Sequence, residues 1–501
     1  MQRSLYSQNR DATFAFDNSY ARLPERFYAK LAPTAVAKPA LVKLNEPLAQ
    51  ALGLSPDWLA SSEGVQTLAG NNLPEGAEPL AMAYAGHQFG NWVAQLGDGR
   101  AILLGEVRDA MGIRRDIQLK GAGPTPFSRN GDGRAALGPV LREYIISEAM
   151  FALGIPTTRS LAAVTTGEQV LRQDGLLPGA VLTRVARSHV RIGTFEYFGN
   201  RGDVEAVRHL ADYVIERLYP EILRDDNRYR ALLDGVVART AELVARWQLI
   251  GFIHGVMNTD NMAVSGETID YGPCAFMDAF HPAQVFSSID TGGRYAYGNQ
   301  PRIAHWNLVR LAQALLPLLG EDEDRALVSA RAAIDAFRAQ FETALFRGLL
   351  LKIGITDAKD GDVALAGDLL ERMAANKVDF TLLFRLLCDA AELGSDADGP
   401  VRALFENPLA FDEWAVKWRG RLAEMPLKER AELMRRNNPA FIPRNHRIEA
   451  VIVAAQRHGD LVPLEELLRV LQSPYDDQPS FAHYAEAPKP DEIVTQTFCG
   501  T

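Results

Sequence analysis

Two oxygen-bearing side chains in the middle of the chain could together hold a divalent metal ion. Asn261 ends the segment HGVMNTDN (residues 254–261), and Asp270 follows nine residues later at the start of DYG (270–272). Amide and carboxylate oxygens are the hard ligands that Mg²⁺ and Mn²⁺ prefer, and such ions commonly bridge nucleotide phosphates. The pair therefore indicates metal-dependent phosphate chemistry.

Four charged residues nearer the N-terminus could support the same chemistry. Lys120 ends an expected strand and Glu143 lies on the expected helix after it, an arrangement in which a glutamate holds a lysine toward nucleotide phosphates. Arg184 ends a later expected strand and Arg191 lies just beyond it, and a guanidinium presents a planar fork that suits phosphate oxygens. Each of these residues, taken singly, is more often a surface residue. Their order along the chain is what favours a shared site.

Glycines between two expected strands form a candidate phosphate loop, QLGDGR at residues 95–100. Backbone without a Cβ at Gly97 and Gly99 could approach a phosphate closely, and its N–H groups could donate to that phosphate. Asp-Gly is also a common turn dipeptide, so the motif alone favours a plain hairpin turn.

The order of these motifs is that of a protein kinase. Kinases carry H-R-D-L-x-x-x-N, and His254 and Asn261 keep its interval, while DYG stands where kinases have D-F-G. Val256 occupies the place of the kinase catalytic aspartate and cannot accept a proton. Asp260 is the only carboxylate in the segment 254–261. The chain is therefore either a catalytically dead nucleotide-binding scaffold or an enzyme whose chemistry is rearranged around Asp260.

Short apolar runs split by glycines predict strands in the first part of the chain and helices in the second. The expected elements of the first part are strands at 92–96, 101–107, 117–120, 161–164 and 181–185, a loop at 121–133 and a helix at 139–154. In the second part we expect a helix capped by Asp203 and ending before Pro220, a helix at 228–250, a strand–turn–strand at 262–264 and 268–269, and mostly helices to about residue 475.

This pattern predicts an α+β, protein-kinase-like fold of two lobes with extensions at both ends. The expected divisions are an N-terminal extension (1–75), a strand-rich N-lobe (76–186), a helical C-lobe (187–400) and a C-terminal helical extension (401–501).

Composition limits the partners. The net charge of −10 argues against nucleic-acid binding, which needs a cationic surface. No apolar run has the length of a membrane helix or a signal peptide, and three widely separated cysteines suit a reducing compartment, so we expect a cytoplasmic protein. We also expect a monomer.

Several longer segments resemble the selenoprotein O family of pseudokinases. They are AGHQFG (85–90), QLGDGR (95–100), LKGAGPTPFSR (119–129), SHVRIGTFEYF (188–198), HGVMNTDNM (254–262), DYGPCAF (270–276), residues 445–459 and the terminal CGT (499–501). This resemblance implies a protein adenylyltransferase that moves AMP from ATP to Ser, Thr or Tyr hydroxyls of target proteins. ATP would bind in the reverse of its kinase orientation, and UTP is a possible second donor.

The resemblance also implies a role for each candidate residue. Lys120, held by Glu143, would contact the phosphates, and Asp260 would accept the proton. Asn261 and Asp270 would hold Mg²⁺ or Mn²⁺, with Asp270 also close to the nucleotide. The other implied nucleotide-binding residues are Gly97, Gly99, Arg100, Asp132 and Gly133 in the loops, and Arg184 and Arg191 at the outward-turned phosphates.

Cys499 matches the redox-type cysteine that the family carries near its C-terminus. An internal disulfide switch is not expected here, because Cys274 lies in an apolar run and is predicted to be buried and inert.

Overall fold

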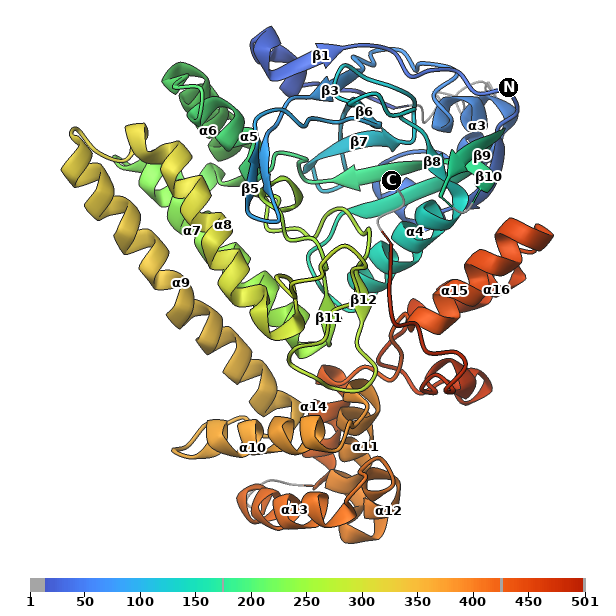
Figure 1. Cartoon of the computed structure of the whole chain (residues 1–501), viewed down its shortest axis with the longest axis vertical. Helices are drawn as coiled ribbons and strands as arrows, with labels where there is room; N and C mark the ends of the chain where they lie inside the picture. The colour runs from blue at the N-terminus through green and yellow to red at the C-terminus, as the bar shows by residue number, and fades with distance from the viewer. Residues whose placement is uncertain (1–13, 174, 424–426, 499–501) are drawn as a thin grey trace, which may run out of the picture.

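An antiparallel sheet organises the first part of the chain (Figure 1). In the computed structural model, which describes residues 14–173, 175–423 and 427–498, this sheet has eight strands, with the short β8 (Ala135–Ala136) paired beside β10. The other strands, in spatial order, are β1 (Tyr28–Lys30), β3 (Leu80–Met82), β6 (Ala101–Arg108), β7 (Arg114–Lys120), β10 (Gly175–Ala186), β9 (Arg159–Arg172) and β2 (Ala40–Leu44).

Side chains alternate between the two faces of the sheet, as the pleat requires. On β10, Val181 and Val185 join one apolar cluster, whereas Ala180 and Leu182 join another on the opposite face. Three short helices cover the first face and one long helix covers the second. The three are α1 (Glu46–Ala51), α2 (Pro56–Ala60) and α3 (Ser62–Leu68), and the long one is α4 (Leu137–Ala152).

Most expected elements of this part are confirmed. β6, β7, β9 and β10 contain the strands expected from residue 101 onward, and α4 is the expected helix. The strand expected at 92–96 is shorter and is not part of the main sheet. In the described residues, β5 (Asn91–Val93) pairs with β4 (Gly86–Gln88) in a separate hairpin.

Long helices dominate the second part of the chain (Figure 1). Asp203 caps α6 as expected, since its side chain accepts a hydrogen bond from the backbone N–H of Ala206 at 3.0 Å. The helix expected at 228–250 is α7. The helices here are α5 (Ile192–Gly199), α6 (Val204–Leu218), α7 (Arg228–Leu249), α8 (Gln300–Leu315) and α9 (Glu323–Lys352).

The prediction that residues 262–264 and 268–269 pair with each other in a strand–turn–strand is wrong. Residues 262–264 bond to residues 190–192, with Ile192 N–H donating to the Met262 carbonyl at 2.9 Å. Thr268 instead pairs with Thr157 beyond the end of α4. The turn at Gly266 exists, but each arm finds a partner in another element. This ties the loops after α7 to both β10 and α4.

A second apolar core lies below the first and is built from later helices (Figure 1). These helices are α10 (Asp362–Ala375), α11 (Phe380–Leu393), α12 (Asp398–Arg402), α13 (Pro408–Leu422) and α14 (Leu427–Asn437). The chain then returns to the sheet, where α15 (Asn445–Val453) and α16 (Val462–Leu471) pack on α4. Packing therefore crosses the boundaries expected at residues 75 and 400, since β1 and β2 form the sheet edges and α14 packs against α11.

Within the described ranges, no helix has both the length and the apolar character needed to cross a membrane. Even α9, with 30 residues, carries charged residues along its course.

A buried arginine connects the returning segment to the second core. Arg444, whose side chain is 1% exposed, donates to Asp379 at 2.9 Å and to Asp278 at 2.5 Å. Asp379 also caps α11 by accepting from Leu382 N–H at 2.8 Å. Three segments far apart in the sequence thus share one buried cluster of charges.

We predict that Arg444→Met destabilises the protein strongly, because it leaves the buried Asp379 and the half-buried Asp278 without this cation. Removing one partner of a buried ion pair costs about 3–5 kcal/mol. Thermal melting should therefore move down by several degrees. Arg338→Met is the control, since Arg338 is an exposed residue of α9 that pairs with Glu342 one turn away. Equal melting of both variants would contradict the role of Arg444.

Candidate active site

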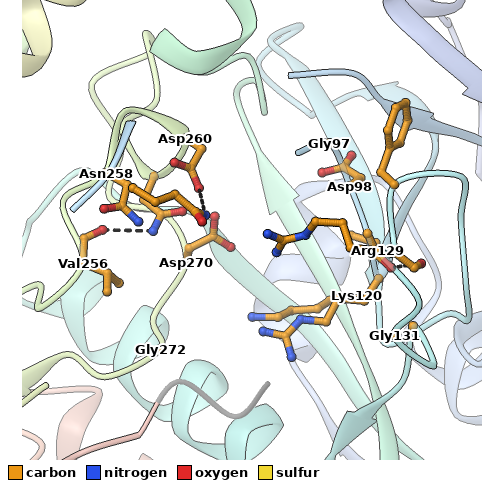
Figure 2. Close-up of a pocket in the computed structure, with 18 of the residues that line it drawn as sticks. Gly97, Asp98, Lys120, Arg129, Gly131, Val256, Asn258, Asp260, Asp270 and Gly272 are labelled. Atoms are coloured by element: carbon orange, nitrogen blue, oxygen red, sulfur yellow. Dashed lines mark hydrogen bonds between the residues drawn. The ribbon is translucent and has the colours of Figure 1, made fainter. Parts of the chain in front are cut away.

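A cavity of about 860 Å³ lies between the sheet and the loops that follow α7. Figure 2 shows Val256, Asn258, Asp260 and Asp270 on one side of it, and Gly97, Lys120, Arg129 and Gly131 on the other. Its volume is within the range of about 300–1,000 Å³ that is usual for small-molecule sites. The expected site residues that line it are Gly97, Gly99, Arg100, Lys120, Asp132, Gly133, Arg184, Arg191, Asp260, Asn261 and Asp270. Glu143 lies behind Lys120.

Lys120, at the end of β7, and Glu143, on α4, form the ion pair that the sequence predicts. The Lys120 Nζ to Glu143 Oε2 distance is 2.5 Å, and Glu143 Oε1 accepts from Arg184 Nε at 2.5 Å. Burial lowers the pKa of Lys120 to about 8, and the nearby Arg184 charge acts in the same direction. Burial would raise the pKa of Glu143, but Arg184 and Lys120 outweigh it and keep this carboxylate ionised.

Asp270 is shared between the two arginines. Its Oδ1 accepts from Arg184 Nη2 at 2.6 Å, and its Oδ2 accepts from Arg191 Nη1. Burial alone would raise the pKa of Asp270, but the charges of Arg191 and Arg184 hold that pKa well below its ordinary range. Both guanidinium groups are almost completely buried. Arg184 and Arg191 therefore form one cationic wall with a carboxylate at its centre.

The loop after α7 is held by its own side chains and by α8. His254 is buried, with its Nε2 2.9 Å from the carbonyl oxygen of Ile269 and its backbone N–H donating to Gln300 at 2.9 Å. The side-chain amide of Asn261 donates to the carbonyl of Val256 at 2.9 Å. These bonds close the loop on itself and fix Asn261 and Asp260 at the cavity wall.

Asp260 is a buried carboxylate with little hydrogen bonding. Its Oδ2 accepts from Gln88 Nε2 at 3.2 Å, and its Oδ1 is buried without a partner. Burial raises the pKa of Asp260 to about 6, although Gln88 and the charge of Arg191 oppose this. A carboxylate of this kind is better able to accept a proton near neutral pH than an exposed one.

The hairpin of β4 and β5 lies over this loop, and its contribution to the site was not foreseen. His87 N–H donates to Thr259 Oγ1 at 2.8 Å, and Phe89 N–H donates to Asn258 Oδ1 at 3.0 Å. Gly86 lies so close that a Cβ there would be 2.4 Å from Asp260 Oδ1. AGHQFG is a family-like segment, but nothing in its residue types indicates that it supports a carboxylate 170 residues later.

The glycine loops face the cavity, although packing explains their glycines. A Cβ on Gly97, which has a φ of +83°, would be 2.3 Å from the ring of Phe127, and one on Gly99 would be 2.8 Å from the Phe127 carbonyl oxygen. Asp98, between them, is buried and accepts from Gln118 Nε2 at 3.1 Å. The loop is thus a turn clamped onto residues 125–128, and it also borders the cavity.

The oxygen donors fit a divalent ion shared with phosphates. The side-chain nitrogen of Asn261 donates to the Val256 carbonyl, which leaves Oδ1 of Asn261 available as an oxygen donor. Each carboxylate oxygen of Asp270 accepts one arginine proton and keeps a further lone pair. Within the part of the chain that the structure describes, no cluster of three His, Cys, Asp or Glu side chains could hold a metal ion. Magnesium suits such a site, because it commonly takes one or two protein ligands and completes its shell with phosphates and water.

Cys274 is buried, as expected, and burial raises the pKa of its thiol to about 12. It is therefore unreactive. Cys499 lies outside the described residues.

The fold and the site together define a class: a mixed α and β protein with a nucleotide-sized cavity lined by buried cations and carboxylates. A family model described as "Protein adenylyltransferase SelO" matches residues 11–472. A protein nucleotidyltransferase YdiU from a Bradyrhizobium species is 66% identical over 97% of this chain and 99% of its own length. Proteins of the same name from Methylorubrum populi and Rhodopseudomonas palustris are 64% and 62% identical, over 98% and 97% of this chain and 100% and 99% of their own lengths.

The chain therefore belongs to the SelO family, and it is an enzyme of the nucleotidyltransferase class.

We predict that Asp270→Asn lowers the melting temperature, because Arg184 and Arg191 lose the carboxylate that they share. Arg184 then keeps only Glu143 among its described ion-pair partners, and Arg191 keeps only Asp98, at 3.8 Å. Added ATP without metal should recover part of the loss, since its phosphates offer the missing negative charge. The control is Asp132→Asn, which removes a carboxylate from the exposed mouth of the same cavity, where it pairs with Arg172. An Asp270→Asn protein as stable as this control, with no gain from ATP, would show that the arginines do not depend on Asp270.

Proposed function

We propose that this enzyme transfers AMP from ATP to Ser, Thr or Tyr hydroxyls of target proteins and releases pyrophosphate. The observation that supports this most is the position of the carboxylates in the loop after α7. Val256, which lines the cavity where a kinase would have its catalytic aspartate, is apolar, whereas Asp260 is a buried carboxylate at the same cavity. We also infer that the sheet and the helical half correspond to the two lobes of a protein kinase.

In the proposed reaction, the acceptor hydroxyl oxygen forms a bond to the α-phosphorus of ATP. The bond from that phosphorus to the oxygen bridging the β-phosphate breaks, and pyrophosphate leaves. The hydroxyl proton passes to the carboxylate of Asp260, which Gln88 orients. Because Oδ1 of Asp260 is buried against Gly86, the proton would be taken by Oδ2, the oxygen that Gln88 holds.

Cations of the chain would hold the triphosphate during this step. Lys120, Arg184 and Arg191 line the cavity and present a charged wall, and fixed charges in a buried site stabilise a transition state without reorganising. The reversed orientation of ATP is carried over from the family resemblance. Asn261 and Asp270 would hold Mg²⁺ or Mn²⁺, which offsets negative charge on the phosphate oxygens when bound.

The test is to incubate the protein with Mg²⁺, a bacterial protein extract and ATP labelled at either the α- or the γ-phosphate. We predict that only the α-label enters protein, and that Asp260→Asn reduces this transfer about 100-fold or more while ATP binding remains. Asp324→Asn, an exposed change on α9, is the matched control. Transfer of the γ-label would indicate a kinase, and ATP binding without any transfer would indicate a catalytically dead scaffold.

A second prediction concerns pH. Lys120 has a pKa of about 8, so it is charged below this pH and loses its charge above it. Its contact with ATP should therefore weaken by about three- to tenfold as the pH rises from about 7.5 to 9. Metal-free titration calorimetry would measure this affinity. Lys120→Arg stays charged over the whole range, so an equally steep decline in that variant would mean that Lys120 is not the titrating group.

A further inference from the structure

A basic and aromatic surface borders the cavity on the side of Asp260. We call it the Trp306 patch and define it as His87, Trp92, Arg294, Trp306 and Arg310. Both guanidinium groups lie over the same indole, each 4.9 Å from the centre of the Trp306 ring. The His87 ring is 5.2 Å from that indole and 5.0 Å from Trp92, which is 38% exposed. His87 and Trp92 lie on β4 and β5, Trp306 and Arg310 lie on α8, and Arg294 lies in the segment before α8.

The two arginines of this patch contact an aromatic ring, Trp306, rather than a carboxylate. In the described ranges, neither guanidinium forms an ion pair with a carboxylate, and the Nε atom of each is buried without a hydrogen-bond partner. The nearby carboxylate of Glu196 is already bonded to His87 at 2.6 Å. Arg310 acts on Glu196 only through its charge, which opposes the rise that burial causes in the pKa of that carboxyl. Two cations on one indole, neither in an ion pair with a described carboxylate, form a local attractor for anions.

The patch is directly continuous with the catalytic loop. Gly90 follows Phe89, a cavity residue, and a Cβ on Gly90 would be 3.4 Å from the Arg294 guanidinium carbon. Tyr295, next to Arg294, donates its hydroxyl to Asn258 Oδ1 at 2.5 Å, and Phe89 N–H donates to the same oxygen. A polypeptide that presents a hydroxyl to Asp260 from this side would therefore cross Arg294.

We propose that the Trp306 patch binds carboxylates that flank the acceptor hydroxyl, so that the enzyme selects acidic target segments. This inference rests on the proposed function. A guanidinium stacked on an indole is held flat, and its N–H edge remains available to make a two-pronged contact with a carboxylate. Lysine-rich or neutral segments would gain nothing from the two arginines. The net charge of −10 works against the binding of acidic segments elsewhere on the protein, which favours the patch as the place where they bind.

The test uses two fluorescein-labelled peptides, one with a central serine flanked by four glutamates and the other with glutamines in their place. Anisotropy without ATP should show that the glutamate peptide binds about twentyfold more tightly, and that this preference falls as NaCl is added. Arg294→Gln and Arg310→Gln should each reduce the preference about fivefold, and the double variant should abolish it. Arg302→Gln is the control, since Arg302 is an exposed arginine near the start of α8 that bonds to Asn299.

Equal binding of the two peptides by the unaltered protein would overturn the inference. So would a preference that survives in the double variant, provided that melting curves show it to be folded. Transfer of α-labelled AMP to the two peptides separates this inference from the proposed function. Transfer without a glutamate preference refutes only the patch, whereas a glutamate preference in binding without transfer to any protein supports the patch and refutes the AMP-transfer proposal.

Discussion

The carboxylate of Asp270 is the centre on which the rest of the site depends. Arg184 and Arg191 are buried, and neither could remain so without an anion close by. Asp270 supplies that anion from a loop between elements of the helical half, while Arg184 comes from the sheet and also holds Glu143 of α4. A continuous network of ion pairs therefore crosses the junction of the sheet and the helices. It runs through Lys120, Glu143, Arg184, Asp270 and Arg191. This network fixes how the sheet and the helical half are oriented relative to each other.

On the other side of the cavity, uncharged backbone groups of the β4–β5 hairpin position Asp260. The β4–β5 hairpin gives backbone N–H groups to Thr259 and Asn258, and its Gly86 leaves just enough space for Asp260. Rigid backbone contacts position a carboxylate without adding a charge that would lower its basicity. The cavity therefore joins a wall of fixed charges, suited to holding phosphates, to a carboxylate whose surroundings favour proton uptake.

The sequence could predict those features that depend on regular elements. Lys120 and Glu143 meet as expected, because β7 and α4 have clear strand and helix patterns and only a loop and the two-residue β8 separate them. The shared use of Asp270 by two arginines could not be predicted, because it depends on where three separate segments meet. The arms at 262–264 and 268–269 were paired wrongly for a similar reason: their apolar pattern fits any strand partner, and only the tertiary fold selects it. The strands of the hairpin at 86–93 are too short to show a pattern of alternating apolar residues, so its position over Asp260 could not be predicted either.

The packing of α15 and α16 on α4 has a consequence for synthesis. α4 carries Glu143, and its neighbour Arg142 is paired with Glu449 of α15 at 2.6 Å. Gly138, one turn earlier, lies against Gln456 and Ile452, so residues beyond 445 cover this side of α4. Chains leave the ribosome N-terminus first, at about 5–20 residues per second. The helix α4, whose Glu143 holds Lys120 and Arg184, thus lacks its packing partners α15 and α16 during most of translation, because they are synthesised near the end. A nascent or C-terminally clipped chain would have the residues of the site without the support that aligns them, which ties the onset of nucleotide chemistry to the completion of the polypeptide.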